Sequence, residues 1–142
     1  MKENKHPIRL EQVWFTRSVV IALQDHKPSD SALKDNGPEN AINVAPIDGQ
    51  EGRYQANMTT KLNMEGDPIF PYIIDMECIG VFTADISLPK EEALRAITIT
   101  AHSVLFGAIR EAVAWITGRH PFGQLMLGLS VLRSSPQEQP KK

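Results

Sequence analysis

Residues that could perform chemistry are few in this chain, and their spacing does not assemble a familiar site. Four histidines, His6, His26, His102 and His120, are scattered along the sequence without metal-ligand spacing, and a single cysteine cannot make a zinc site. The sequence contains neither a phosphate-binding loop nor a Gly-x-Ser-x-Gly motif. It therefore predicts a protein that is not an enzyme and that needs no metal or other cofactor.

The acidic residues Asp75 and Glu77 and the thiol of Cys78 are the remaining candidates for catalysis. The two acids are spaced i, i+2 within a strand pattern, which places both side chains on one polar, solvated face. Cys78 falls on the opposite, inward face of the same strand, where a cysteine is typically an inert core thiol. A solvated surface is therefore favoured over a catalytic pair at Asp75 and Glu77.

The composition predicts a single domain. With 142 residues and a formal net charge of −2 spread over both signs, the chain has room for a core and no basic surface for nucleic acid. The lone cysteine excludes an internal disulfide and favours a cytoplasmic protein, and the N-terminus lacks the apolar core of a signal peptide. No apolar run reaches the roughly 18 residues of a membrane span, because Arg110 and Glu111 interrupt the longest one. We expect a flexible N-terminus (1–9), one domain (10–132) and a disordered tail (133–142).

Alternating apolar side chains predict four antiparallel strands. The clearest alternation runs through residues 53–64 and 72–83. Apolar residues at the odd positions predict another strand at 13–23, with one face much drier than the other. A short strand around Ile42 and Val44 completes the set.

A helical stripe of apolar residues organises the second half of the sequence. It runs from Ala101 to Gly118, where we expect the glycine to take the left-handed conformation that caps a helix. Gly107 in its interior is explained most simply if another backbone packs closely against it. The start signals at 87–92 predict a separate short helix, with a bend at the β-branched run 97–100. The sequence thus predicts an α+β fold, a four-stranded antiparallel sheet with a short helix and a long C-terminal helix packed on one face.

The segment after Pro121 is more apolar than one sheet face requires. Between Phe122 and Leu132 the only polar side chains are Gln124 and Ser130, and the alternation that would mark one wet face is missing. In one interpretation the segment caps the core and the helix. In the other it forms an apolar groove for other chains, or a subunit interface. The sequence leaves both open.

The helix and the segment after it resemble the signature of the SecB export chaperones. That family has a Leu-Phe-Pro opening, an Arg-Glu pair in the helix, an Arg-Gly stop and then Phe-Pro-Gln-Leu. The strand order and the long loop after the first strand are also similar. Gly107 and Gly123 stand where the family usually has proline, and S-S-P-Q-E-Q-P-K-K replaces the family's terminal helix. The matching residues are Leu105, Phe106, Arg110, Glu111, Phe122, Gln124 and Leu125.

The resemblance implies an ATP-independent holdase that binds unfolded polypeptide clients or preproteins in apolar grooves for protein export. SecB proteins also dock the SecA motor through acids on the exposed sheet. Here Ser18 and Ala22 occupy the positions of the first-strand acids, while Asp75, with Glu77 nearby, remains on the fourth strand. The candidate client-binding residues, each equally explicable as core, are Ile42, Val44, Phe122, Leu125, Leu127 and Leu129.

Two other functions stay open. A SecB-like protein can be a dedicated chaperone or adaptor for one partner, such as a toxin–antitoxin component, and the lost acids and the missing terminal helix fit a narrower client. The fold can also serve as an interaction module that has no chaperone activity. Binding to unfolded model chains separates this third function from the first two.

We also expect a homo-oligomer, and the resemblance implies a dimer of dimers. Independently of the family, the strand at 13–23 is long and apolar enough to pair with a symmetry mate. On the main helix, Phe106 and Trp115 lie at the margins of the apolar stripe, and Gly107 permits close approach of another helix. These three residues are the candidate oligomer interface.

Overall fold

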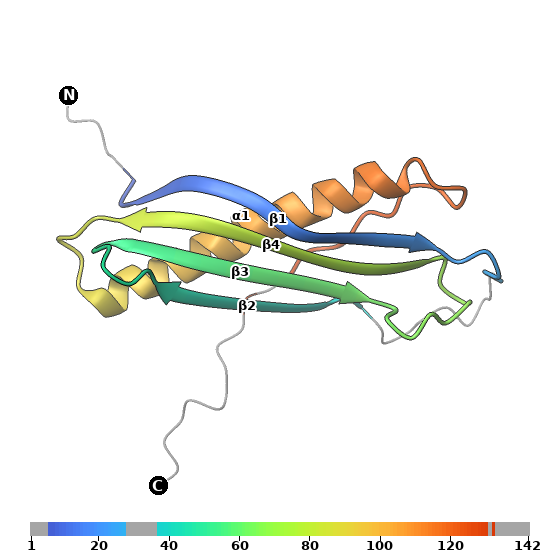
Figure 1. Cartoon of the computed structure of the whole chain (residues 1–142), viewed down its shortest axis with the longest axis horizontal. Helices are drawn as coiled ribbons and strands as arrows, with labels where there is room; N and C mark the ends of the chain where they lie inside the picture. Colours follow the sequence, from blue (N-terminus) through green and yellow to red (C-terminus); the bar gives the residue numbers. More distant parts are fainter. Residues whose placement is uncertain (1–5, 28–36, 131, 133–142) are drawn as a thin grey trace, which may run out of the picture.

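The computed structural model describes residues 6–27, 37–130 and 132, which form one sheet and one helix. The strands β1 (Ile8–Ala22), β2 (Glu39–Pro46), β3 (Arg53–Leu62) and β4 (Tyr72–Ala84) precede the helix α1 (Lys90–Thr117). All strand pairs are antiparallel, in the order β1-β4-β3-β2 (Figure 1). The predicted α+β class, with four antiparallel strands and a long C-terminal helix, is confirmed.

The helix α1 covers one face of the sheet, which we call the inner face; the opposite face is the outer face. Figure 1 shows α1 crossing the sheet obliquely, from an N-terminal end near β2 to a C-terminal end beyond β1. After α1 the chain returns behind the sheet, on the side of the helix (Figure 1). An oblique helix leaves part of the inner face uncovered, and the returning chain lies there.

Two β-bulges in β1 redirect its side chains. The register with β4 shifts at Glu11 and again at Thr16, each of which is an extra residue on β1. Upstream of Thr16 the odd residue Phe15 packs against the core, whereas downstream of it the even residues Val20 and Ala22 do so. The prediction that the odd positions form one dry face throughout this strand is therefore wrong beyond Thr16, because a bulge reverses the alternation.

Both bulge residues make polar contacts across the outer face. The carboxylate of Glu11 accepts hydrogen bonds from Arg53 Nε at 3.0 Å and from Thr83 Oγ1 at 2.6 Å. The Thr83 and Arg53 hydrogen bonds lower the pKa of Glu11 below its usual value. Thr16 Oγ1 donates a hydrogen bond to Glu77. The bulges thus join β1 to β4 and β3 by side chains as well as by the backbone ladder.

The core lies between α1 and the inner face, and Gly80 of β4 sets how closely the two approach. A Cβ atom at Gly80 would lie 2.7 Å from Phe82 Cε1 and 3.1 Å from Leu105 Cδ2. Phe82 and Leu105 are fully buried, so neither can move away freely. In contrast, nothing lies within 4 Å of a Cβ atom built at Gly107. The close backbone contact predicted at Gly107 is not made within the described chain.

The helix α1 is continuous over 28 residues, so the predicted division into a short helix, a bend and a main helix is wrong. The β-branched run 97–100 stays helical because Ile97 is fully buried, and Thr98 Oγ1 donates to the carbonyl of Leu94 at 2.7 Å. Burial outweighs a propensity penalty of at most about 0.7 kcal/mol per residue. At the other end Gly118 has a φ of −60°, which is right-handed, so the predicted left-handed cap is also wrong.

The predicted boundaries agree best for β3 and β4. β1 begins at Ile8, inside the stretch expected to be a flexible N-terminus, and β2 extends on both sides of Ile42 and Val44. Residues 28–36 of the predicted loop and the predicted tail at 133–142 lie outside the described residues.

By length and composition alone, α1 is able to cross a membrane, since an 18-residue window within it has a mean hydropathy of 1.2. The sequence prediction rested on the lack of a continuous apolar run, which is a stricter criterion. Core helices of globular proteins also pass the composition test, and α1 packs on a sheet. The finding is therefore a weak indication of a span.

Candidate functional site

The residues after α1 form an extended stretch, 121–130, which we call the C-terminal segment; it has no regular secondary structure. Its turn is made by Gly123, whose φ of 86° is favourable for glycine alone. Tyr72 Oη donates to the carbonyl of Gly123 at 2.6 Å, and the Leu125 amide donates to Thr117 Oγ1 at 2.8 Å. These two hydrogen bonds direct the chain back over the inner face.

An aromatic cluster supports the same turn. The ring of Phe122 makes an edge contact with His26, with centroids 5.0 Å apart, and lies 6.1 Å from the ring of Tyr72. His26 follows β1, and its Nδ1 lies 2.7 Å from the carbonyl oxygen of Pro68 in the connection between β3 and β4. The start of the C-terminal segment is therefore joined to two loops at one end of the sheet.

Further along, the C-terminal segment lies between α1 and β2, in a space that we call the α1–β2 groove. Ser130 Oγ accepts a hydrogen bond from Asn40 Nδ2 of β2 at 3.1 Å and lies 3.1 Å from His102 Nε2 of α1. Leu127 is only 3% exposed and belongs to the core, against which Leu125 also packs. The segment thus covers the part of the inner face that the oblique helix leaves open.

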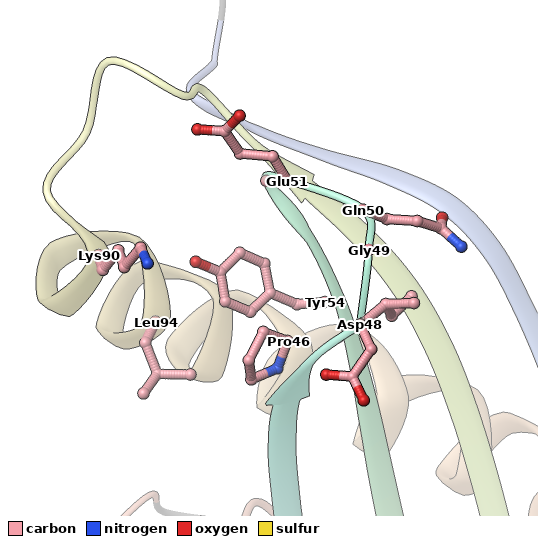
Figure 2. Close-up of a pocket in the computed structure, with 10 residues that line it drawn as sticks. Pro46, Asp48, Gly49, Gln50, Glu51, Tyr54, Lys90 and Leu94 are labelled. Carbon is pink, nitrogen blue, oxygen red and sulfur yellow. The ribbon is translucent and has the colours of Figure 1, made fainter.

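A second, empty space lies at the other end of β2 (Figure 2). This hollow of about 500 Å³ separates the turn between β2 and β3 from the first turns of α1. Figure 2 shows the ring of Tyr54 directed between Pro46 and the helix residues Lys90 and Leu94. Asn40 and Pro46 mark the two ends of the inner side of β2. The hollow and the contact of Ser130 with Asn40 therefore lie at opposite ends of the inner side of β2.

The predicted client-binding residues lie on the inner side of β2 or in the C-terminal segment, and they differ in accessibility. Leu127 is buried, whereas Phe122 is 39% exposed and Leu129 is 90% exposed. The remaining three candidates are partly buried and pack against the core that contains Leu127. They are Ile42, Val44 and Leu125.

The predicted partner-docking acids Asp75 and Glu77 lie on the outer face, and both are engaged within the chain. Arg17 Nε is 2.9 Å from Asp75 Oδ1, and Glu77 accepts the hydrogen bond from Thr16. Lys61 of β3 stands opposite Asp75 in the register. Two cationic side chains therefore accompany Asp75 and reduce the negative charge that this face presents.

The residues predicted at an oligomer interface divide into two kinds. Trp115 is 60% exposed and stacks against the guanidinium of Arg119 at 3.7 Å. Gly107 borders a hollow of about 420 Å³ between α1 and the C-terminal segment, which Met126 also lines. Phe106 is 4% exposed and belongs to the core. The accessible candidates are thus Trp115 and Gly107.

Burial governs the titratable groups near the core. It raises the pKa of the Cys78 thiol from 9.0 to about 11, so the thiol stays protonated, as expected for an inert core cysteine. It also raises the pKa of Tyr72, which keeps the phenol as a hydrogen-bond donor to Gly123. Within the part of the chain that the structure describes, no three His, Cys, Asp or Glu side chains converge on a metal position.

Comparison with known proteins connects this arrangement to a chaperone family, although no protein-family model matches the chain. The chain is 26% identical over 113 residues to the protein-export protein SecB of Anaplasma phagocytophilum (strain HZ). The alignment covers 76% of this chain and 72% of that protein. It is 22% identical over 111 residues to SecB of Anaplasma marginale (strain Florida), in an alignment that covers 76% of this chain and 63% of that protein. A SecB-like chaperone of Mycobacterium tuberculosis has the same fold, with a TM-score of 0.58 and 19% identity, covering 87% of this chain and 88% of that one. This chain is SecB-like.

The structural relatives of this SecB-like chain also show how little the fold alone says. The M. tuberculosis chaperone is in complex with a ChAD peptide from the HigA1 antitoxin. A protein of unknown function from Streptococcus agalactiae matches with a TM-score of 0.61 at 8% identity, covering 86% of this chain and 97% of that one. Function must therefore be argued from the groove and not from the fold.

Sequence reasoning missed the polar residues that contact one another within the α1–β2 groove. Buried Thr60 donates to Asn40 Oδ1 at 2.7 Å, and Asn40 in turn reaches Ser130 beside His102. The available signals were a threonine among the apolar even residues of β3 and a histidine next to the helical stripe. Each indicates a buried polar partner without naming it.

Proposed function

We propose that this SecB-like chain is an ATP-independent holdase that binds apolar stretches of client polypeptides in the α1–β2 groove. The observation that carries the proposal is the C-terminal segment, an extended apolar stretch of polypeptide seated between α1 and β2. Its side chains Leu125 and Leu127 occupy the positions that a client's side chains would take. Exposed Phe122 and Leu129 enlarge the apolar surface beside the groove.

The relatives support a chaperone or export-related role. Two are protein-export proteins, and the M. tuberculosis chaperone is bound to a peptide. We infer that the clients are unfolded polypeptides or preproteins, met in the cytoplasm before export. A client with one extended apolar stretch suits the groove better than a folded protein does.

A light-scattering assay with aggregation-prone clients tests the proposal. Stoichiometric chain should suppress aggregation without ATP, and unchanged aggregation across several clients would contradict a holdase. A crosslinking pull-down from native cell extract then identifies the clients. A spread of unfolded secretory precursors supports export, whereas one dominant partner, such as a toxin–antitoxin component, would make the chain a dedicated adaptor.

We further propose that the chain assembles as a homo-oligomer, as a dimer of dimers. β1 is an edge strand whose side chains Val13, Trp14 and Ile21 are exposed, and such an edge favours pairing with a second copy. Trp115 and the open space at Gly107 offer a second accessible surface, on α1.

Size exclusion coupled to light scattering measures the assembly directly. A mass near one 15.8 kDa chain at micromolar concentration would contradict assembly. If a second helix packs at Gly107, Gly107→Leu should lower the mass. The exposed α1 residue Arg95 supplies the control, because Arg95→Leu adds the same side chain elsewhere on the helix.

We expect a motor such as SecA, if it binds, to dock on the outer face at Asp75 and Glu77. A basic partner must compete there with Arg17 for Asp75 and with Thr16 for Glu77. Since exposed ion pairs are weak and screened by salt, we expect such docking to be weak and to decline with ionic strength.

A further inference from the structure

Side chains, and not the backbone, hold the distal part of the C-terminal segment, residues 126–130, in the α1–β2 groove. Leu125 and Leu127 enter or pack against the core two residues apart, as alternate residues of an extended chain do. Among the described residues, no backbone hydrogen bond joins residues 126–130 to the sheet or to α1. Met126 and Leu129 are exposed between and beyond these contacts. The segment therefore occupies the groove in the way a peptide ligand does.

We propose that the C-terminal segment is an internal competitor for the client site, seated in the α1–β2 groove of the resting chain and displaced when a client binds. The inference rests on the proposed holdase function and specifies the ligand. The fitting ligand is an extended polypeptide with large aliphatic residues at alternating positions, in place of Leu125 and Leu127. A hydroxyl or amide side chain three residues further on would meet Asn40 and His102, as Ser130 does.

The distribution of contacts favours displacement of the distal half of the segment. Its proximal half is held by Tyr72 and Thr117, so the distal half can leave the groove while the turn stays in place. Nothing lies within 4 Å of a Cβ atom built at Gly128, so a side chain at this point of the distal half would extend into open space.

A client also has contacts available that the segment does not make. The hollow beside Tyr54 and Leu94 lies at the Pro46 end of β2, beyond Ile42 and Val44, and no residue of the segment lines it. A tethered segment competes at an effective concentration on the order of 1 mM, so a client displaces it only by binding the groove more tightly than the segment does. A longer client that reaches the hollow gains apolar contact that residues 121–130 lack.

A reversible crosslink tests the displacement in the full-length chain. Asn40 Nδ2 and Ser130 Oγ are 3.1 Å apart, so the two side chains face each other, and a small shift of the segment towards β2 lets the pair Asn40→Cys/Ser130→Cys close a disulfide. Cys78 is fully buried and does not compete for oxidation. The probe is fluorescein-labelled lactalbumin that has been reduced and carboxymethylated, which keeps it unfolded. We expect the closed form to bind this probe at least tenfold more weakly than the same protein after reduction.

Matched variants control for the chemistry of the crosslink and for the fold. Each single-cysteine variant should have one affinity, the same after oxidation as after reduction. Leu127→Ser loosens the segment and should bind the probe about tenfold more tightly than the wild type. Gly128→Ala, in the same segment, adds a methyl group to open space and should bind as the wild type does. If Leu127→Ser does not fold by circular dichroism, the crosslink alone decides.

The outcomes separate this inference from the proposed function. Equal affinity of the closed and reduced forms, with binding retained, overturns the competitor and leaves the holdase intact. Tighter binding by the closed form overturns the competitor as well. No binding of the probe by the wild type, the reduced form or Leu127→Ser overturns both.

Discussion

Replacing Gly80 by alanine should destabilise the fold by crowding the core between β4 and α1. The added methyl group would lie 2.7 Å from the ring of Phe82 and 3.1 Å from Leu105. Both side chains are fully buried, so the clash cannot be relieved by turning either one toward solvent. Either the ring leaves its preferred position or the helix shifts outward. Both responses strain a core that is packed at high density.

The expected cost of Gly80→Ala is about 1–3 kcal/mol, the range for inserting a methyl-sized group into a packed core. For a chain of this size, each kcal/mol lowers the melting temperature by about 3–4 °C, so the loss should be about 3–12 °C. Urea unfolding followed by far-UV circular dichroism gives the free energy independently of the two tryptophans. A lower urea midpoint, with the same dependence of the unfolding free energy on urea concentration, would show that the variant is less stable. It would also show that the variant exposes the same amount of surface on unfolding as the wild type.

The matched control is Gly107→Ala, which adds the same methyl group to α1 where nothing lies within 4 Å. Alanine is favoured over glycine in a helix interior by about 1 kcal/mol, so this variant should be more stable than the wild type. If Gly80→Ala is as stable as the wild type, the account of close packing at β4 is wrong. If Gly107→Ala loses stability instead, a second chain packs against α1 at that point.

Two further substitutions test the anchor of the C-terminal segment and the buried thiol. Thr117→Val leaves the amide of Leu125 unpaired in a partly buried position and should cost about 1–3 kcal/mol in urea unfolding, while Thr117→Ser, which keeps the hydroxyl, should cost less. Because burial raises the pKa of Cys78 from 9.0 to about 11, the unfolded chain loses this proton first, so stability should fall as the pH rises from 9 towards 11. Cys78→Ala should flatten that part of the pH profile, and an unaltered profile would assign the alkaline loss to other groups.

Sequence patterns predicted β3 and β4 well because inward-facing residues recur at every second position and the register between the two strands has no shift. β1 was predicted less well for a physical reason. A bulge inserts one residue and so exchanges the two faces, and no residue type announces it. Arg17 was the visible exception among the odd positions of this strand, and the structure explains it. Arg17 follows the bulge at Thr16, faces outward and pairs with Asp75.

The sequence predicted which apolar residues belong to the candidate site, but it did not predict how they are arranged in space. The surplus of apolar residues after Pro121 indicated a groove or a cap, and the C-terminal segment is buried at Leu127 yet exposed at Leu129. The two glycines show the limit most clearly. Gly107 and Gly80 both lie inside regular elements, but only the three-dimensional packing reveals that Gly80 faces Phe82 and Leu105.

The groove is a consequence of the continuity of α1. At a rise of about 1.5 Å per residue, its 28 residues extend about 42 Å, which is close to the length of β4. A straight rod of that length, about 10 Å wide, covers only a diagonal band of a four-stranded sheet. A bend at 97–100 would have let two shorter helices cover more of the inner face, and less of it would then remain for residues 121–130. Because Ile97 is buried and the run stays helical, one corner beside β2 stays open, and the apolar chain after Pro121 occupies it. The continuity of α1 therefore explains both the absence of the predicted bend and the place of the apolar residues after Pro121. It is at this corner that the proposed competition between a client and the C-terminal segment would take place.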